Sequence, residues 1–349
     1  MSLEVQVGDL VFKNPIIVGS AGYAEDENGI KRFIKRGYAG IVTKSTSKNP
    51  LSGAPPPRVF WYDPYRKLYL DWDEAHRNPG IEKMAEHIKA CKSLADKENC
   101  HIIGSISCNT IDEGVYVATK FYEAGVSAIE IDMQCPAIGP HLGPEYATRG
   151  GSYWGDPGHP ERAVELIKAL KSAVDVPIWP KITTLSIYLN GEVIEKSSNP
   201  DAFSYMGYTF PFYPLGLALD LDTGRPIFNG NTLLKIKKGV KFKPHFPGAL
   251  PLLPTTVLAT ALLKRKLKTP LVPSGGIMRG FDVIQVMMAG GSAVEICTAI
   301  YRDINIIENM LREMRWYMNK KGIDRLSEIV GISIEYIPFD LMEIPIPRT

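Results

Sequence analysis

Short apolar runs alternate with amphipathic runs along nearly the whole chain. The apolar runs predict strands at Asn14–Val18, Gly40–Thr43, His101–Ser105, Ala128–Ile131, Val176–Lys181, Ala202–Met206, Pro270–Pro273 and Ala293–Ile296. Helical periodicity predicts helices at Gly29–Arg36, Ile81–Ala95, Asp112–Ala124, Pro160–Ala173, Leu252–Lys264, Gly280–Ala289 and Ile304–Lys320, and a weakly marked one within Ser186–Ser198. Eight strand–helix units in 349 residues favour an α/β fold of the (β/α)8 TIM-barrel class, although periodicity alone leaves an open sheet as the alternative.

Two long segments interrupt this alternation. Leu51–Arg77 is rich in proline and aromatic residues, and Tyr208–Gly248 has the pattern of a small β-hairpin insert. Both follow strands on the side of the barrel where sites are built, so we expect them to help roof the site over the C-terminal face. No break in composition marks a linker, and we therefore predict one domain over residues 1–349.

Composition narrows the function classes. The net charge is +2, which favours neither a nucleic acid nor a membrane surface as partner. Met1–Val7 alternates like a strand and lacks the features of a signal peptide, so we expect no leader or anchoring helix. The five cysteines are scattered and show no metal-ligand spacing, so we expect no metal site: Cys91, Cys100, Cys108, Cys135 and Cys297. Free thiols fit a reducing compartment, so we expect a cytoplasmic protein. We also expect a homo-oligomer.

Cys135 stands at an informative place in the sequence. The apolar run Ala128–Ile131 leads through Asp132-Met133-Gln134 to Cys135 and Pro136, and a glycine-rich loop follows. Proline prevents the strand ladder from continuing, so the thiol lies where a strand ends and a loop begins. In α/β barrels catalytic groups occupy that position, and a thiol there can act as acid, base or nucleophile. A small buried hydrophobe is the competing interpretation.

Small residues mark the ends of the last two predicted strands. Ser274-Gly275-Gly276 follows one strand, and Cys297-Thr298 follows the other. Glycine allows the backbone to approach an anion closely, and in barrels the last two loops commonly bind phosphate. Ordinary turn formation explains most glycine pairs, but small residues at both loops favour a phosphate site. No glycine fingerprint for a dinucleotide occurs in a strand-to-helix turn.

Two lysines lie at predicted strand ends. Lys44 follows Ile41–Thr43, and Lys181 follows Trp179-Pro180. A lysine in an apolar strand is costly unless it meets a partner, and an anionic ligand or an electron-rich ring at the barrel mouth would be one. Solvation at the strand end is the alternative for each lysine taken alone.

Together these pieces resemble the dihydroorotate dehydrogenases and the pyrimidine-reducing domain of dihydropyrimidine dehydrogenases. The resemblance covers nearly the whole chain and depends on the order and spacing of its motifs. These are Lys13-Asn14-Pro15, Gly19–Gly22, Thr43–Thr46, Pro56-Pro57-Arg58, Asp132–Pro136, Lys181, Pro273–Ile277 and Ile296–Ala299.

The resemblance implies a barrel that holds FMN, with Cys135 as the active-site base of the soluble, cysteine-using branch. It places Lys181 at the N1/O2 side of the flavin and Lys44 near the reactive edge and the substrate. The other residues implied to bind the cofactor are Ala21, Gly22, Ser45, Ser105 and Asn109 around the flavin, and Gly248, Gly275, Gly276, Cys297 and Thr298 at the phosphate.

The chain departs from the family pattern where a pyrimidine would be recognised. The usual Asn-Leu-Ser-Cys-Pro-Asn is Asp132-Met133-Gln134-Cys135-Pro136-Ala137 here, and the pair after the sixth strand is Tyr208-Thr209. The family's asparagines pair with the amide edges and the carboxylate of the pyrimidine. Because unmet polar groups in a site are costly, these losses predict altered substrate recognition.

The leading hypothesis is an FMN-dependent oxidoreductase acting on a CH–CH bond of a small ring. A flavin-free lyase or isomerase with Lys181 or Lys44 as Schiff-base lysine stays open, as does a flavin subunit that only relays electrons. Without a nicotinamide or cluster motif, electrons would leave through a diffusing acceptor or a separate subunit.

Overall fold

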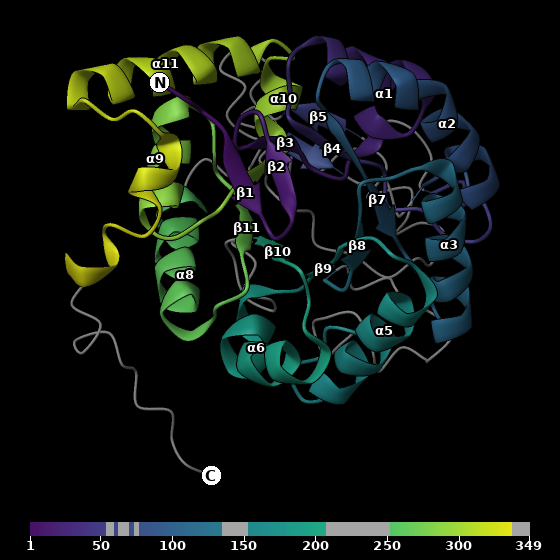
Figure 1. The fold of residues 1–349 in the computed structure, drawn as a ribbon. Helices are drawn as coiled ribbons and strands as arrows, with labels where there is room; N and C mark the ends of the chain where they lie inside the picture. Colours follow the sequence, from purple (N-terminus) through teal and green to yellow (C-terminus); the bar gives the residue numbers. More distant parts are fainter. Residues whose placement is uncertain (54–58, 62–69, 73–76, 135–152, 207–251, 337–349) are drawn as a thin grey trace, which may run out of the picture.

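The computed structural model describes residues 1–53, 59–61, 70–72, 77–134, 153–206 and 252–336. Within these residues eight parallel strands close a barrel in the order β10-β11-β12-β3-β4-β7-β8-β9 (Figure 1). They are β3 (Ile16–Val18), β4 (Gly40–Val42), β7 (His101–Ile106), β8 (Ala128–Asp132), β9 (Ile178–Lys181), β10 (Phe203–Met206), β11 (Leu271–Ser274) and β12 (Val294–Ile296). The predicted (β/α)8 barrel is confirmed, and each predicted strand corresponds to one barrel strand.

Helices surround the barrel and follow the strands as predicted. They are α1 (Glu27–Lys35), α2 (Ile81–Lys97), α3 (Ile111–Ala124), α5 (Pro160–Ala173), α6 (Thr184–Ser198), α8 (Leu252–Lys266), α9 (Gly280–Met288) and α11 (Ile306–Lys321). Local signals set their ends. Thr110 caps α3 by accepting from the backbone N–H of Glu113 at 3.2 Å, and Gly125 ends α3 in the left-handed region at φ 88°. A short helix, α10 (Thr298–Arg302), was not predicted.

A hairpin of β1 (Val5–Val7) and β2 (Leu10–Phe12) packs against the amino-terminal end of the barrel (Figure 1). The Phe12 ring is fully buried, with its centre 4.6 Å from that of His101, the first residue of β7, and 6.1 Å from that of Trp179 in β9. The apolar alternation at the start of the chain therefore forms a strand, as predicted, and the hairpin places the apolar Phe12 ring beside β7 and β9.

The segment Leu51–Arg77 contains a second antiparallel hairpin, formed by β5 (Val59–Trp61) and β6 (Leu70–Trp72). The sequence predicted a hairpin only in Tyr208–Gly248, and residues 207–251 lie outside the described part of the chain. Val59 is paired with Trp72 and Trp61 with Leu70, and valine and tryptophan are residue types that favour strands.

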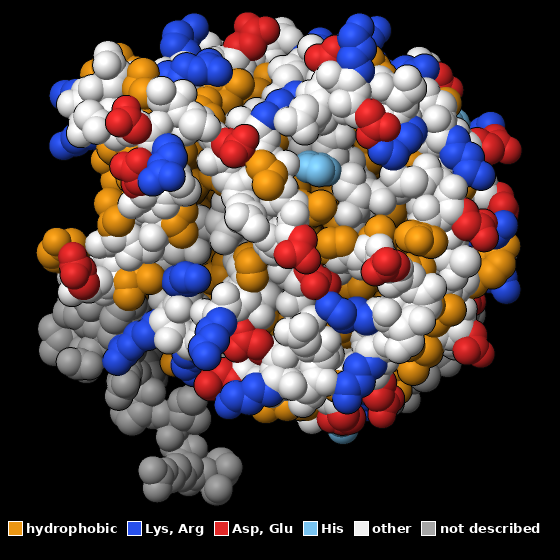
Figure 2. Space-filling view, in the orientation of Figure 1, with side chains coloured by type: hydrophobic (Ala, Val, Ile, Leu, Met, Phe, Trp, Pro, Cys, Tyr) orange, Lys and Arg blue, Asp and Glu red, His pale blue; other side chains and the backbone are white. Residues whose placement is uncertain are grey.

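The face of the molecule in Figure 2 carries charges of both signs. In the view of Figure 2, Lys and Arg side chains alternate with Asp and Glu over the helices, and neither sign covers a continuous face. Among the helices that the structure describes, none is long and apolar enough to cross a membrane. Three 3-10 turns complete the described elements: η1 (Gly22–Ala24), η3 (Leu326–Ile329) and η4 (Ile334–Tyr336).

Candidate active site

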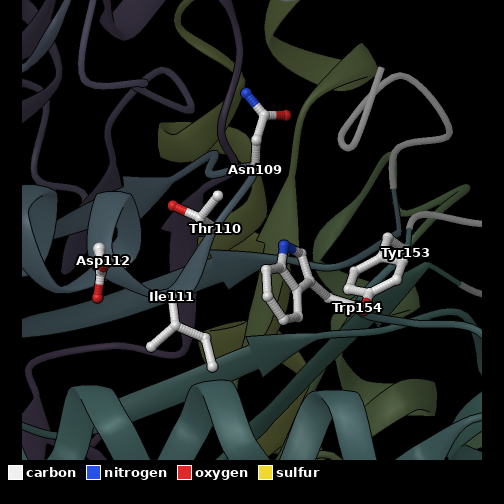
Figure 3. A pocket seen from close by; sticks show the side chains of 6 residues that line it. All are labelled: Asn109, Thr110, Ile111, Asp112, Tyr153 and Trp154. Carbon is white, nitrogen blue, oxygen red and sulfur yellow. The ribbon is translucent and has the colours of Figure 1, made fainter. Parts of the chain in front are cut away.

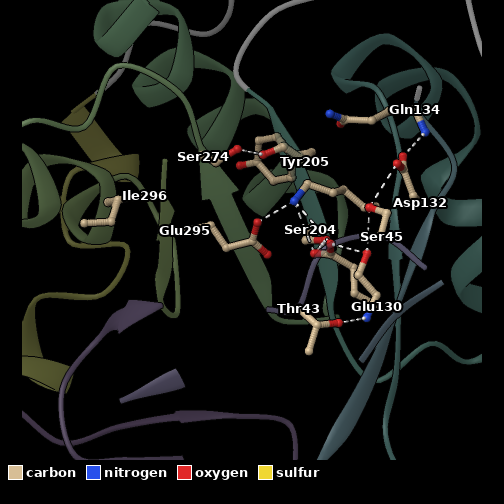
Figure 4. A network of polar contacts seen from close by, with 12 residues as sticks. Thr43, Ser45, Glu130, Asp132, Gln134, Ser204, Tyr205, Ser274, Glu295 and Ile296 are labelled. Carbon is tan, nitrogen blue, oxygen red and sulfur yellow. Dashed lines mark hydrogen bonds and ion pairs between the residues drawn. The ribbon is translucent and has the colours of Figure 1, made fainter. Parts of the chain in front are cut away.

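A buried ion cluster lies inside the carboxyl half of the barrel (Figure 4). The Lys181 ammonium at the end of β9 lies 3.2 and 3.4 Å from the two carboxyl oxygens of Glu130 in β8. The same nitrogen lies 2.5 Å from Oε2 of Glu295 in β12. Ser204 of β10 donates to Glu130 at 2.8 Å. Charged side chains from β8, β9 and β12 therefore meet, with the carboxyls of Glu130 and Glu295 on the Lys181 nitrogen.

Burial governs the electrostatics of this cluster. The side chains of Glu130, Glu295 and Lys181 are 0%, 1% and 7% exposed. Burial, followed by the negative charge of Glu295, raises the pKa of Glu130 well above its ordinary value, and Lys181 offsets only part of this effect. Burial disfavours the Lys181 ammonium, but Glu130 and Glu295 outweigh it, and the pKa of Lys181 is raised. Lys181 is therefore a fixed cation.

A second polar group adjoins the cluster. The hydroxyls of Ser45, after β4, and Ser105, in β7, lie 3.1 Å apart, and Ser105 is 3.5 Å from Glu130. Ser45 also donates to Asp132 at 3.4 Å. All four side chains are buried. Ser45, Ser105, Asp132 and Lys181, predicted as separate site residues, are thus brought into one hydrogen-bonded network.

Local backbone contacts hold the loops that follow β4 and β8. Asp132 accepts from the backbone N–H of Gln134 at 3.3 Å, which turns the chain directly before residue 135. Thr46 donates to the Lys44 carbonyl at 2.6 Å, and the Lys44 N–H donates to the Ala24 carbonyl. Lys44 is 6% exposed, so both lysines predicted at strand ends are buried residues.

The loop after β11 depends on both of its glycines. Gly275 has φ 113° and Gly276 has φ 74°, which side-chain-bearing residues rarely adopt. A Cβ at Gly276 would lie 2.3 Å from the backbone nitrogen of Leu253 in α8, so this glycine also allows the loop to pack on that helix. Turn formation and packing therefore account for the pair. The loop adjoins β12, because Ser274 is paired with Glu295.

The end of β12 meets the end of β3. Cys297 and Thr298 begin α10, while Ala21 and Gly22 begin the turn η1 after β3. Gly19 donates to the Ile296 carbonyl at 2.9 Å, which joins the two strand ends. Tyr23 lies at this junction, where burial and the Cys297 thiol raise its pKa. Ala21 and Gly22, predicted at the flavin, and Cys297 and Thr298, predicted at the phosphate, thus follow two adjacent barrel strands.

Asn109 occupies the rim of the barrel, where it lines a hollow of about 310 Å³ (Figure 3). The hollow lies between the start of α3 and the Tyr153-Trp154 pair that precedes α5. The Trp154 indole is buried and donates to the Cys108 carbonyl at 2.9 Å. Trp154 therefore fastens the end of the loop after β8 to the loop after β7.

Five predicted site residues lie outside the described part of the chain. They are Cys135, Ala137, Tyr208, Thr209 and Gly248. Their assigned roles remain predictions. Within the residues that the structure describes, no group of histidine, cysteine, aspartate or glutamate side chains is arranged to hold a metal ion.

The sequence analysis missed Glu130, Glu295 and Ser204. A signal was present, because Glu130 stands between Ile129 and Ile131 and Glu295 between Val294 and Ile296. A carboxylate flanked by apolar residues in a buried strand requires a partner. The sequence did not reveal that Lys181 is that partner for both.

Comparison with known proteins agrees with this geometry. The family model described as dihydroorotate dehydrogenase matches residues 2–206, which is more than half of the chain. The chain belongs to the dihydroorotate dehydrogenase family. It is an oxidoreductase of that type.

Several relatives of this dihydroorotate dehydrogenase family member match along almost their full length. The protein of Methanocaldococcus jannaschii is 27% identical over 339 residues, covering 95% of this chain and 98% of its own. That of Thermoanaerobacter pseudethanolicus is 28% identical over 335 residues, covering 95% and 98%. That of Geobacillus sp. is 27% identical over 332 residues, covering 95% of each. All three are named dihydroorotate dehydrogenase B (NAD(+)), catalytic subunit.

We predict that Lys181→Met destabilises this dihydroorotate dehydrogenase family member. Removing the cation leaves Glu130 and Glu295 buried together, which costs roughly 3–5 kcal/mol of unfolding free energy. A carboxyl whose pKa is raised in the folded state contributes stability below its unfolded pKa, and this is lost as the pH rises through the folded pKa. The deficit, measured by denaturant unfolding, should therefore shrink as the pH falls.

Lys171→Met is the matched control. Lys171 pairs with Asp201 at 2.8 Å, but its side chain is 29% exposed. Removing a partly solvated pair should cost about 1 kcal/mol or less. Equal losses in the two variants would contradict the role assigned to the Lys181 cluster.

Proposed function

We propose that the chain is an FMN-dependent dehydrogenase of the dihydroorotate dehydrogenase type, acting on the CH–CH bond of a small cyclic substrate. The observation that carries the proposal is Lys181, a cation fixed in the barrel of a member of this family. Bound FMN would supply hydride transfer at its N5 atom, and positive charge near N1 and O2 favours the reduced anionic flavin. Family membership and this fixed charge together support the cofactor.

The residues at the carboxyl ends of the strands suit this cofactor. Lys181 and Lys44 are both buried, so an anionic or electron-rich group at the mouth would meet cations that water screens little. Ala21 and Gly22 present small residues at the end of β3. Gly275, Gly276, Cys297 and Thr298, with Gly248, are our proposed phosphate contacts, and small residues allow an anion to approach the backbone closely.

Cys135 is the proposed acid/base group for the substrate. It follows the turn in which Asp132 accepts from the Gln134 N–H, so the end of β8 is held at the residue directly before it. A thiol at this position would remove or deliver a proton on one face of the ring. Asp132, Ala137, Tyr208, Thr209 and Lys44 are the proposed substrate contacts.

Electron transfer out of the protein is proposed to use a separate acceptor or subunit. The matching relatives are named catalytic subunits and are named for NAD(+). The sequence of this chain carries no dinucleotide fingerprint. A partner subunit that binds NAD(+) is consistent with this absence and with the names of the relatives. We propose that the chain likewise acts as the catalytic subunit of an assembly in the cytoplasm.

Schiff-base chemistry at Lys181 is disfavoured. A lysine attacks a carbonyl only as a neutral amine, whereas the Glu130 and Glu295 carboxyls raise the pKa of Lys181 and hold it charged. The cluster therefore argues against this lysine as the nucleophile of a flavin-free lyase or isomerase.

We expect the purified protein to be yellow and to release FMN on denaturation. Absorbance spectra before and after denaturation, with chromatography of the released compound, measure this directly. Lys181→Met should weaken FMN binding or lower its reduction potential, because a charge that stabilises the reduced form is lost. A colourless protein that also fails to bind added FMN would refute the proposal.

Cys135→Ser should retain FMN and slow substrate-driven reduction roughly 10²–10⁴-fold, the usual contribution of one acid/base group. Anaerobic stopped-flow absorbance gives the rate. Cys91→Ser is the control, because Cys91 is buried in α2 and its Sγ contacts the Glu27 carbonyl. If Cys135→Ser reduces as fast as the Cys91→Ser control, the role belongs elsewhere, and His141 in the same loop is the next residue to test.

We expect weak or no activity with dihydroorotate. Asp132, Ala137 and Tyr208 stand where the usual family pattern has asparagines that pair with the pyrimidine. Each lost hydrogen bond to a charged ligand costs roughly 1.5–3 kcal/mol, so several losses lower affinity by decades. Anaerobic titration with dihydroorotate measures the effect. Rapid bleaching at micromolar concentration would show that other residues replace these contacts.

A further inference from the structure

The Lys181 cluster contains two carboxyls and one ammonium. Glu130 lies in β8 and Glu295 in β12, and both contact Lys181 Nζ (Figure 4). Asp132 also raises the pKa of Lys181, and its carboxylate accepts from Ser45 and from the Gln134 N–H. With both glutamates ionised the buried trio would carry one uncompensated negative charge, an arrangement that is costly away from water.

The contacts of Glu295 show how this charge is balanced. Its Oε2 atom faces Lys181, but Oε1 is buried and accepts no hydrogen bond from the residues that the structure describes. The Glu130 and Glu295 carboxyls contact the same Lys181 nitrogen, at 3.2 and 2.5 Å, and the negative charge of Glu295 raises the pKa of Glu130. Two ionised carboxylates are acceptors only, so a hydrogen bond from one carboxyl to the other requires a proton on one of them.

We propose that Glu130 and Glu295 share one proton, so that the Glu130–Lys181–Glu295 cluster is electrically neutral at neutral pH. The shared proton supplies the missing donor at Glu295 and removes the surplus charge. Like-charged carboxyls in contact commonly retain one proton between them. Ser204 and Ser105 donate to Glu130, and the Ser204 hydrogen bond offsets part of the rise in the Glu130 pKa that burial and Glu295 cause.

This arrangement makes Glu295 a positioning residue that acts through Lys181. Two carboxyls hold the ammonium from opposite strands, and with the shared proton they carry one negative charge, which balances the single positive charge of Lys181. The Lys181 ammonium has three N–H donors and contacts three carboxyl oxygens, two of Glu130 and one of Glu295. The role of this ammonium beside a flavin rests on the proposed function, whereas the shared proton does not.

Infrared spectroscopy of the purified protein without cofactor tests the proton directly. At neutral pH we expect the stretching band of one protonated glutamic acid, which shifts when glutamate is labelled with ¹³C at its side-chain carboxyl. Glu130→Gln and Glu295→Gln should each abolish the band, because the remaining carboxylate then pairs with Lys181 alone. Glu195→Gln should retain it, because Glu195 accepts from the Lys268 N–H and from the N–H and hydroxyl of Thr269.

The absence of this band in the labelled wild-type protein, or its persistence in Glu295→Gln, would overturn the proposal. If a variant does not fold, the labelled wild-type spectrum decides alone.

The reduction potential of bound FMN is a second measurement. With a shared proton, Glu295→Gln leaves the cluster neutral and the potential near the wild-type value; with two ionised glutamates it removes a negative charge and raises the potential. Failure to bind FMN would refute the proposed function and leave the infrared result intact.

Discussion

The ion cluster around Lys181 is the constraint on which the site depends. Glu295 in β12 reaches Lys181 across the barrel interior, because β10 and β11 separate their strands along the barrel wall. Charged groups without water require partners with good geometry, and here the partners are on opposite parts of one closed sheet. The cluster is therefore satisfied only when the barrel is closed in its native register, which couples the site to the fold.

The two ends of the barrel have different chemistry for a simple geometric reason. Residues two apart in a strand point to the same side of the sheet, so the side chains of Trp179 and Lys181 both point into the barrel from β9. Trp179 packs near Phe12 of the amino-terminal hairpin, whereas Lys181 meets the carboxyls nearer the carboxyl end. One strand thus carries the apolar core at one end and the charged site at the other.

The network around the cluster links the strand ends to each other. Ser105 contacts both Ser45 and Glu130, and Ser45 reaches Asp132, so loops after β4 and β8 share hydrogen bonds. In a barrel, sites are built from the ends of several strands, and this network is the physical means of holding them together. These residues include several that we propose as contacts of the flavin and the substrate.

Hydrophobic periodicity in the sequence was sufficient to predict the barrel strands and the positions of most helices. Each strand is a short apolar run that is buried on both faces, and Thr110 and Gly125 mark helix ends locally, so no distant information is needed. The short helix α10 and the hairpin of β5 and β6 were missed because short elements carry little periodic signal. Motif order along the chain also indicated the family.

The pairing inside the barrel was decided by tertiary structure alone. The sequence shows Lys181, Glu130 and Glu295 as isolated charges, separated by 51 and 114 residues from the lysine. Nothing local specifies that they meet, because their contact follows from the closure and register of the sheet. The sequence therefore determined the alternation of strands and helices and the types of residue at the strand ends, whereas only the closed barrel made one lysine and two glutamates a single buried site.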